Sequence, residues 1–160
     1  MAEREFHHEC RAAGLIFKTF DEWSEWLAAH KYDIASPIAE HEGFKYNVND
    51  VCVNPHVKSY KIETNWEWQV KTAKTPGGWI WGYDISTNTS GSAAPASYPR
   101  RDDDKAAFFN TEDEASMDAL NYIIRQLEGR KPKTKNINLL VWAAKKARLE
   151  IKHPQLELFT

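Results

Sequence analysis

Two alternating segments joined by a Pro-Gly-Gly turn constrain the fold of this chain more than any other feature. Trp66, Trp68 and Val70 alternate with polar residues before the turn. After it, the same period is kept by Trp79, Trp81, Tyr83 and Ile85. Such a period of two is typical of a strand with one buried face, and proline and glycine provide the backbone angles of a tight turn. The range 60–86, with four of the seven tryptophans, is therefore predicted to be an antiparallel β-hairpin.

Two sequences of the form Thr-x-x-Glu indicate where helices begin. One starts at Thr19 and precedes a predicted helix over about 20–30, and the other starts at Thr111 and precedes a predicted helix over 112–128. In this motif the threonine side chain accepts a hydrogen bond from the backbone N–H of the glutamate. The glutamate side chain in turn accepts a hydrogen bond from the backbone N–H of the threonine. Gly129 follows the second helix, where a glycine with a left-handed backbone commonly ends the helix.

The other segments complete a predicted organisation of one domain and a tail. The range 87–104 is rich in serine, alanine, proline and charge and is predicted to be a long mobile loop, followed by a strand at 105–109. The range 1–129 is then a single α+β domain, a small antiparallel sheet built on the Trp-rich hairpin and packed by two to four helices. The range 130–152 is predicted to be a basic linker and helix, and 153–160 a C-terminal tail.

Composition argues against a disulfide framework and a membrane span. Cys10 and Cys52 are the only cysteines. No apolar run approaches the roughly 20 residues of a membrane helix, and the first residues lack the basic and apolar regions of a secretion signal. We therefore expect a cytoplasmic protein with reduced thiols. The sequence leaves the oligomeric state open.

The chain lacks the usual catalytic and metal-binding motifs. It contains no glycine-rich phosphate loop, no G-x-S-x-G and no HExxH. His7 to Cys10 and Asp102 to Asp104 are consecutive residues, whose side chains diverge instead of converging on one ion. We expect a non-enzymatic protein without a metal or cofactor.

Positive charge gathers near the C-terminus. Residues 130–152 contain eight basic residues and one acidic residue, whereas the whole chain has a formal net charge of −2, so the rest is acidic. Leu140 and Leu149 are expected to face inward on the helix of this segment. The basic residues either contact a polyanion or pair within the molecule. The candidate nucleic-acid-binding residues are Arg130, Lys131, Lys133, Lys135, Lys145, Lys146 and Arg148.

The hairpin, the predicted strand from Ala106 to Phe109 and the helix start Thr111-Glu112-Asp113-Glu114-Ala115 resemble a known type of DNA-binding module. This order is similar to the three-stranded sheet plus helix of the AP2 and phage-integrase arm-binding modules. The resemblance covers roughly residues 60–129 and implies DNA as a partner. In those modules arginines on the outer face of the hairpin read the bases, whereas this hairpin offers Lys71 and Lys74.

The last residues carry the most specific motif of the chain. QLELF, residues 155–159, resembles the pentapeptide through which bacterial polymerases and repair proteins dock on the β sliding clamp. The resemblance implies that Leu158 and Phe159 fill an apolar pocket of the clamp while Gln155 makes polar contacts at its rim. Alternatively, Leu156, Leu158 and Phe159 form a strand that packs on the protein's own sheet.

Two functions of different classes follow from these patterns. The first is a non-enzymatic accessory protein of bacterial or phage and mobile-element DNA transactions, which binds the sliding clamp through its tail and nucleic acid through its basic segment. The second is an aromatic ligand-binding or protein-inhibiting module. In that case its ligand face consists of Trp66, Trp68, Trp79 and Trp81.

Overall fold

The fold is α+β, with three helices and three antiparallel sheets in the part of the chain that the structure describes. The computed structural model describes residues 8–10, 15–29, 37–47, 49–98, 108–131 and 133–154. The elements follow in the order β1 (His8–Cys10), β2 (Leu15–Phe17), α1 (Phe20–Ala29), β3 (Ala39–His41), β4 (Phe44–Tyr46), β5 (His56–Glu63), β6 (Trp66–Thr75), β7 (Gly78–Ser86), β8 (Gly91–Ala94), α2 (Glu112–Glu128) and α3 (Lys135–Lys152).

The central sheet has the strand order β5-β6-β7-β8 and is antiparallel throughout. The predicted hairpin is confirmed over residues 66–86 as β6 and β7, with Trp68 opposite Ile85 and Val70 opposite Tyr83, whereas residues 60–63 of the predicted range belong to β5. Gly78 closes the turn with a φ of +135°, and a Cβ there would lie 2.9 Å from the carbonyl oxygen of Phe109. Both observations require glycine at this position.

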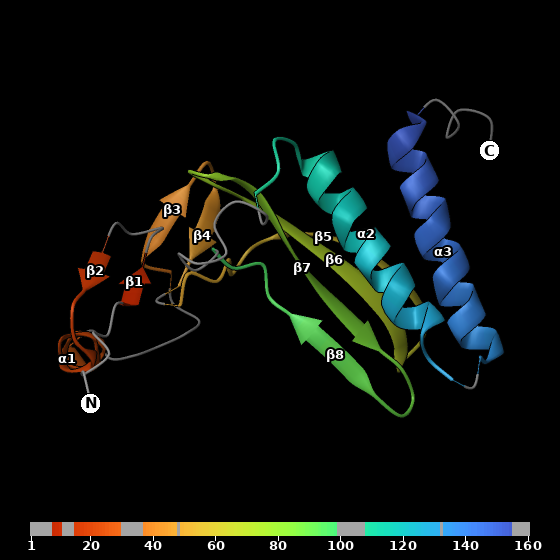
Figure 1. The fold of residues 1–160 in the computed structure, drawn as a ribbon, viewed down its shortest axis with the longest axis horizontal. Coiled ribbons are helices and arrows are strands. Elements are labelled where there is room, and N and C mark those ends of the chain that lie inside the picture. Colours follow the sequence, from red (N-terminus) through yellow and green to blue (C-terminus); the bar gives the residue numbers. More distant parts are fainter. Residues whose placement is uncertain are drawn as a thin grey trace, which may run out of the picture.

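Helices α2 and α3 lie side by side on one face of this sheet (Figure 1). Thr111 and Thr134 cap their N-termini through hydrogen bonds from the backbone N–H groups of Glu114 and Ile137. The helix period directs an apolar stripe of each toward the sheet. They enclose one core with β6 and β7, whose largest buried members are Trp68, Ile85, Leu120, Ile123, Leu127 and Leu140.

Helix α3 therefore belongs to the main core, and the range 130–152 is not a separate arm on a finished domain. Two expectations for this region are wrong. Leu149 is 52% exposed instead of facing inward, because it lies off the stripe that α3 buries against α2 and the sheet. Gly129 has a φ of −75°, so the end of α2 does not use a left-handed glycine.

The turn end of the hairpin is buried on both faces, which corrects the expectation of one buried face. Ile80 and Ala73 point away from the helices and pack against Phe44 and Tyr46 of the β3–β4 hairpin. The chain near Ala96 crosses β7 so closely that a Cβ on Gly82 would overlap its backbone. The sheet therefore joins two cores, one on each face, at different positions along its long strands.

The predicted loop over 87–104 is wrong in part, because β8 lies within it and pairs with β7. Alternation over four small residues is too weak to predict a strand, and pairing with the edge of β7 supplies the missing stability. Residues 99–104 lie outside the described part, as do 105–107 of the predicted strand. Phe109 exchanges two backbone hydrogen bonds with Trp79, of 2.8 and 2.9 Å.

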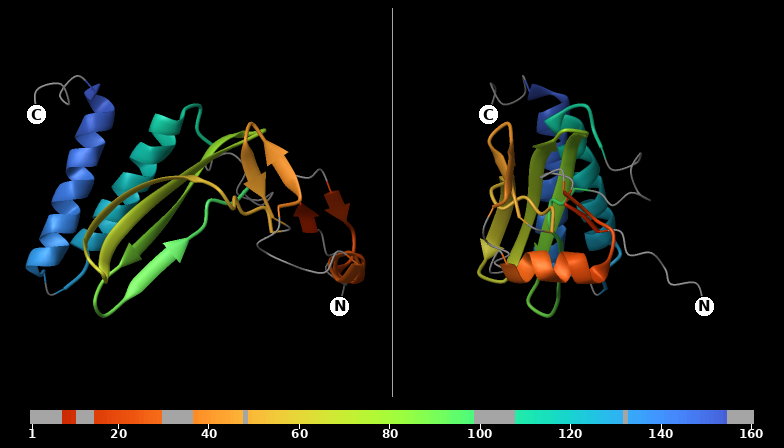
Figure 2. Two further views of the ribbon diagram at one scale, coloured as in Figure 1. Left: turned by 180° about the vertical axis from the view of Figure 1, so that it is seen from behind. Right: turned by 90° about the vertical axis from the view of Figure 1, so that its left-hand side faces the viewer.

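The N-terminal elements lie at the opposite end of the molecule from α3 (Figure 2). Helix α1 starts with the predicted capping motif: the Glu22 N–H donates to Thr19 Oγ1 over 3.1 Å, and the Glu22 carboxylate accepts from the Lys18 N–H over 2.9 Å. Leu27 is buried, and the ring of Trp26 packs against that of Phe17. The helix is thus confirmed over residues 20–29.

Candidate nucleic-acid interface

The solvent-facing side of α3 combines large apolar and basic side chains. It comprises Trp142, Lys145, Lys146, Leu149 and Lys152, which we call the α3 outer face. Steps of three and four residues place them on one side of the helix, opposite the buried Leu140 and Ala144. Trp142 is 54% exposed and Leu149 is 52% exposed, among lysines that are also exposed.

The lysines of the α3 outer face differ in how they are held. Lys146 places its Nζ 5.4 Å from the centre of the Trp142 ring, a cation–π arrangement, and lies 4.0 Å from the carboxylate of Glu150. Lys145 pairs with Glu128 of α2 over 2.9 Å. A hydrogen bond from Lys145 and its positive charge lower the pKa of Glu128. The charge of Lys145 is thus partly compensated within the protein.

Both arginines among the predicted nucleic-acid-binding residues also have structural partners. Arg148 donates to Asn121 Oδ1 on α2 over 2.9 Å. Arg130 donates to Ser90 Oγ over 2.8 Å and to Thr87 Oγ1 over 3.3 Å, so it holds the loop between β7 and β8. For these two residues, the alternative of pairing within the molecule therefore applies. The exposed members between the end of α2 and the first residue of α3 are Lys131, Lys133 and Lys135.

The face of the sheet opposite the helices has mixed charge. Lys61 and Lys71 alternate there with Glu67 and Asp84, and Lys61 lies directly opposite Glu67 in the β5–β6 register. Opposite charges on neighbouring strands compensate one another. In the DNA-binding modules that the sequence resembles, the corresponding sheet face contacts DNA. In this protein the mixed charge of the sheet face suits phosphate groups less well than the lysines of the α3 outer face do.

The predicted clamp-binding residues Gln155, Leu156, Leu158 and Phe159 lie outside the described residues. Helix α3, which precedes them, ends at Lys152, where the His153 N–H donates to the Leu149 carbonyl oxygen over 2.8 Å. Pro154 follows and cannot continue a helix. The α3 outer face thus lies immediately before the tail in the sequence.

The four hairpin tryptophans do not form one exposed ligand face. Trp68 is only 2% exposed, and its indole N–H donates to the Leu140 carbonyl oxygen over 3.1 Å. Trp81 donates to Asp118 Oδ2 over 2.9 Å, and Trp79 packs edge-on against Phe44 with ring centres 5.6 Å apart. These three rings therefore connect the sheet to α3, to α2 and to β4, respectively.

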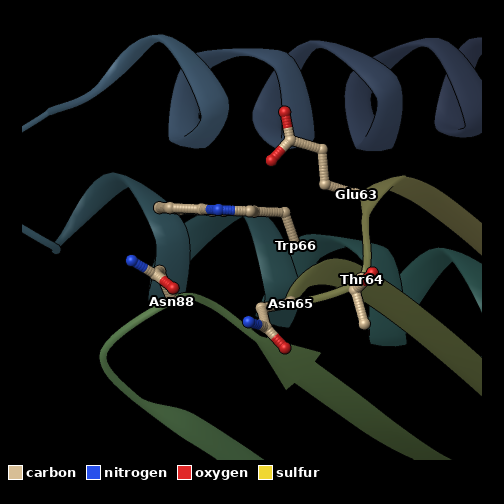
Figure 3. A pocket seen from close by; sticks show the side chains of 5 residues that line it. All are labelled: Glu63, Thr64, Asn65, Trp66 and Asn88. Carbon is tan, nitrogen blue, oxygen red and sulfur yellow. The ribbon is translucent and has the colours of Figure 1, made fainter.

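Trp66 lines a cavity of about 280 Å³. The cavity lies beside the turn between β5 and β6, and its other lining residues are all polar (Figure 3). The ring of Trp66 lies between the carboxylate of Glu63 and the amide of Asn88. The lining residues are Glu63, Thr64, Asn65, Trp66 and Asn88.

Sequence reasoning missed a polar cluster at the start of α2. His56 Nδ1 lies 2.7 Å from Glu112 Oε1, which also accepts a hydrogen bond of 2.8 Å from Thr72 Oγ1. The three residues come from β5, β6 and the first turn of α2, far apart in the chain, so no local pattern could have indicated the cluster. Its hydrogen bonds attach the N-terminus of α2 to the sheet.

The described residues contain no cluster of three or more His, Cys, Asp or Glu side chains suited to a metal ion. Of the helices described, none has both the length and the apolar character that crossing a bilayer requires. Comparisons with protein-family models, with curated proteins and with solved structures found no match. The two resemblances noted in the sequence therefore depend on its residues alone.

Proposed function

We propose that the protein is a non-enzymatic accessory protein of bacterial or phage and mobile-element DNA transactions. It binds DNA with the α3 outer face and docks on the β sliding clamp with its tail. The observation that carries this proposal is the exposure of Trp142 and Leu149 among the lysines of one rigid helix face.

The chemistry of this face matches that of a nucleic-acid backbone. Lysines gain affinity by neutralising phosphates and releasing counterions. An exposed tryptophan adds stacking or apolar contact with sugar and base. Since α3 is fixed by the core on its other side, these groups are held in place before binding, which lowers the entropic cost of association.

The tail adds a second contact at the C-terminal end of the same helix. QLELF begins three residues after Lys152, so a clamp-bound tail holds the α3 outer face near the DNA on which the clamp slides. Linking two weak contacts raises the overall affinity through effective concentration. Each contact alone is then expected to be weak.

Binding to a labelled duplex tests the DNA contact. Replacing both Lys146 and Lys152 with alanine removes two charges from the α3 outer face and is expected to weaken binding about tenfold at low salt. The matched control replaces Lys58 and Lys61, two exposed lysines of β5, and leaves affinity within about twofold. Equal losses in both variants would contradict a site on α3.

Binding to purified bacterial clamp tests the tail. The full chain is expected to bind saturably, and Gln155→Ala and Phe159→Ala each abolish binding because they remove the rim contact and the main apolar anchor. Thr160→Ala, beside the motif, serves as the control. If both variants still bind the clamp, QLELF is not the clamp-binding motif.

The alternative of an aromatic ligand-binding module retains one supporting observation, the polar cavity beside Trp66. Trp68, Trp79 and Trp81 are engaged in internal contacts and do not support it. In this alternative a small neutral ligand binds at Trp66, and its affinity does not depend on salt.

A further inference from the structure

The Trp66 cavity has the chemistry of a site for one flat, polar ring. Trp66 provides an aromatic wall, and the four other lining side chains are short or flexible polar groups. Asn65 and Asn88 can each donate and accept hydrogen bonds, and Glu63 accepts them. The volume of about 280 Å³ falls just below the usual range for drug-sized ligands, which favours a single ring system.

Positive charge lies beside this cavity. Arg130 hydrogen-bonds Thr87 and Ser90, which flank Asn88 in the β7–β8 loop. The connection between α2 and α3 is thereby attached to the loop that lines the cavity. Figures 1 and 2 show the β5–β6 turn, the β7–β8 loop and this connection at the same end of the molecule. Lys131 and Lys133 follow Arg130 along the connection, Lys135 begins α3, and all three lysines are exposed.

We propose that the Trp66 cavity binds one unstacked base of single-stranded DNA, whose phosphates contact Lys131, Lys133 and Lys135. This inference rests on the proposed function and adds a single-stranded contact to the duplex contact of the α3 outer face. The base stacks on the indole of Trp66, as bases stack on aromatic side chains in proteins that bind single strands. The base lies on the face of the ring that Asn65 and Asn88 flank, and its polar edge meets these two amides.

The position of the charges determines which part of the nucleotide enters. The carboxylate of Glu63, on the other face of the Trp66 ring, repels a phosphate from the cavity. The lysines lie outside the cavity and attract the phosphates there. A base inside a duplex is stacked between its neighbours, so only a single strand or an unpaired end can supply it. A free neutral sugar would gain nothing from the lysines.

The test compares two labelled single strands of equal length and charge, one with bases and one built of abasic nucleotides. The full-length protein is expected to bind the strand with bases about tenfold more tightly, since each stacked base contributes substantially to affinity. Trp66→Leu removes most of this difference, whereas Trp66→Phe keeps most of it because an aromatic surface remains.

Trp66 also packs against the core, so a second pair of variants is needed. Asn88→Ala changes an exposed loop residue and is expected to reduce the preference for bases about threefold, because one polar contact is lost. Its neighbour Thr89→Ala, also exposed, leaves the preference unchanged. Thermal unfolding of each variant verifies that it is folded at the assay temperature.

The outcomes separate this inference from the proposed function. Equal, salt-dependent binding of the two strands by the wild-type protein would overturn the base site and leave DNA binding by α3 standing. A Trp66→Leu variant that loses affinity for both strands equally would also overturn it, since this indicates a structural role. Failure to bind any DNA, duplex or single-stranded, would overturn both proposals.

Discussion

At the scale of single residues, surroundings decide what each tryptophan does. Trp68 and Trp142 are chemically identical, yet one is 2% exposed and the other is 54% exposed. Trp68 donates a buried hydrogen bond to α3, whereas Trp142 presents its ring to solvent beside Lys146. The alternation around Trp68 favours burial, but the alternative of an exposed ligand face included the same ring, so the sequence alone did not decide its exposure.

Trp68→Phe is predicted to destabilise the protein strongly. The change leaves a void in the shared core and removes the donor that pairs with the Leu140 carbonyl group, and together these cost about 2–4 kcal/mol. Trp142→Phe, the matched surface change, costs less than about 0.5 kcal/mol. Urea unfolding followed by circular dichroism measures both values. Similar losses in the two variants would contradict the assignment of Trp68 to the core.

The thiol of Cys52 is predicted to be unreactive in the folded protein. Burial raises its pKa, and the thiolate is the reactive form. In a Cys10→Ser background, only Cys52 remains to react with a thiol reagent. At pH 8 the reaction is expected to be slower by at least about tenfold in buffer than in denaturant. Equal rates would show that the β3–β4 core does not protect this residue.

At the scale of elements, local signals predicted the helices well and the strands incompletely. Thr111 and its apolar period define α2 through contacts within a few residues. Strand β8 and the second core at Ile80 depend on partners distant in sequence, namely β7 and the β3–β4 hairpin. The position of α3 in the main core likewise depends on packing against residues distant in sequence. The many charged residues of this helix give little indication that one of its sides is buried.

The contact between α2 and α3 is predicted to weaken at low pH. Lys145 lowers the pKa of Glu128 below its ordinary value of 4.5, so this carboxylate stabilises the fold above that pH and loses its contribution as the pH falls through the lowered pKa. Glu128→Gln should therefore lower the melting temperature slightly at pH 7 and have no effect near pH 3. Because both groups are well exposed, 0.5 M salt should also reduce the effect.

A variant with both Glu128→Gln and Lys145→Gln provides the control for this prediction. If the two groups act as a pair, the double variant loses no more stability than the single variants. A decrease in melting temperature that is the same at pH 3 and pH 7 would contradict an electrostatic origin.

At the scale of the whole molecule, two candidate functional features lie in the half of the fold where helices cover the sheet. They are the α3 outer face and the Trp66 cavity. The sequence indicated the basic segment and the tryptophans but could not tell which side chains are engaged internally. Arg130 and Arg148 make structural contacts, and Trp66 lines a polar cavity. The cavity itself brings together two turns that are separated by more than twenty residues, so its existence depends on the register of β5, β6 and β7.

The most direct test of DNA binding by α3 is the salt dependence of that binding. Affinity for a labelled duplex, measured by fluorescence anisotropy at several salt concentrations, should decrease linearly on a logarithmic plot, because each phosphate contact releases counterions. The variant with Lys146→Ala and Lys152→Ala should have a slope smaller by about two, one unit for each lysine removed. An affinity that does not depend on salt, or an unchanged slope in this variant, would contradict DNA binding by the α3 outer face.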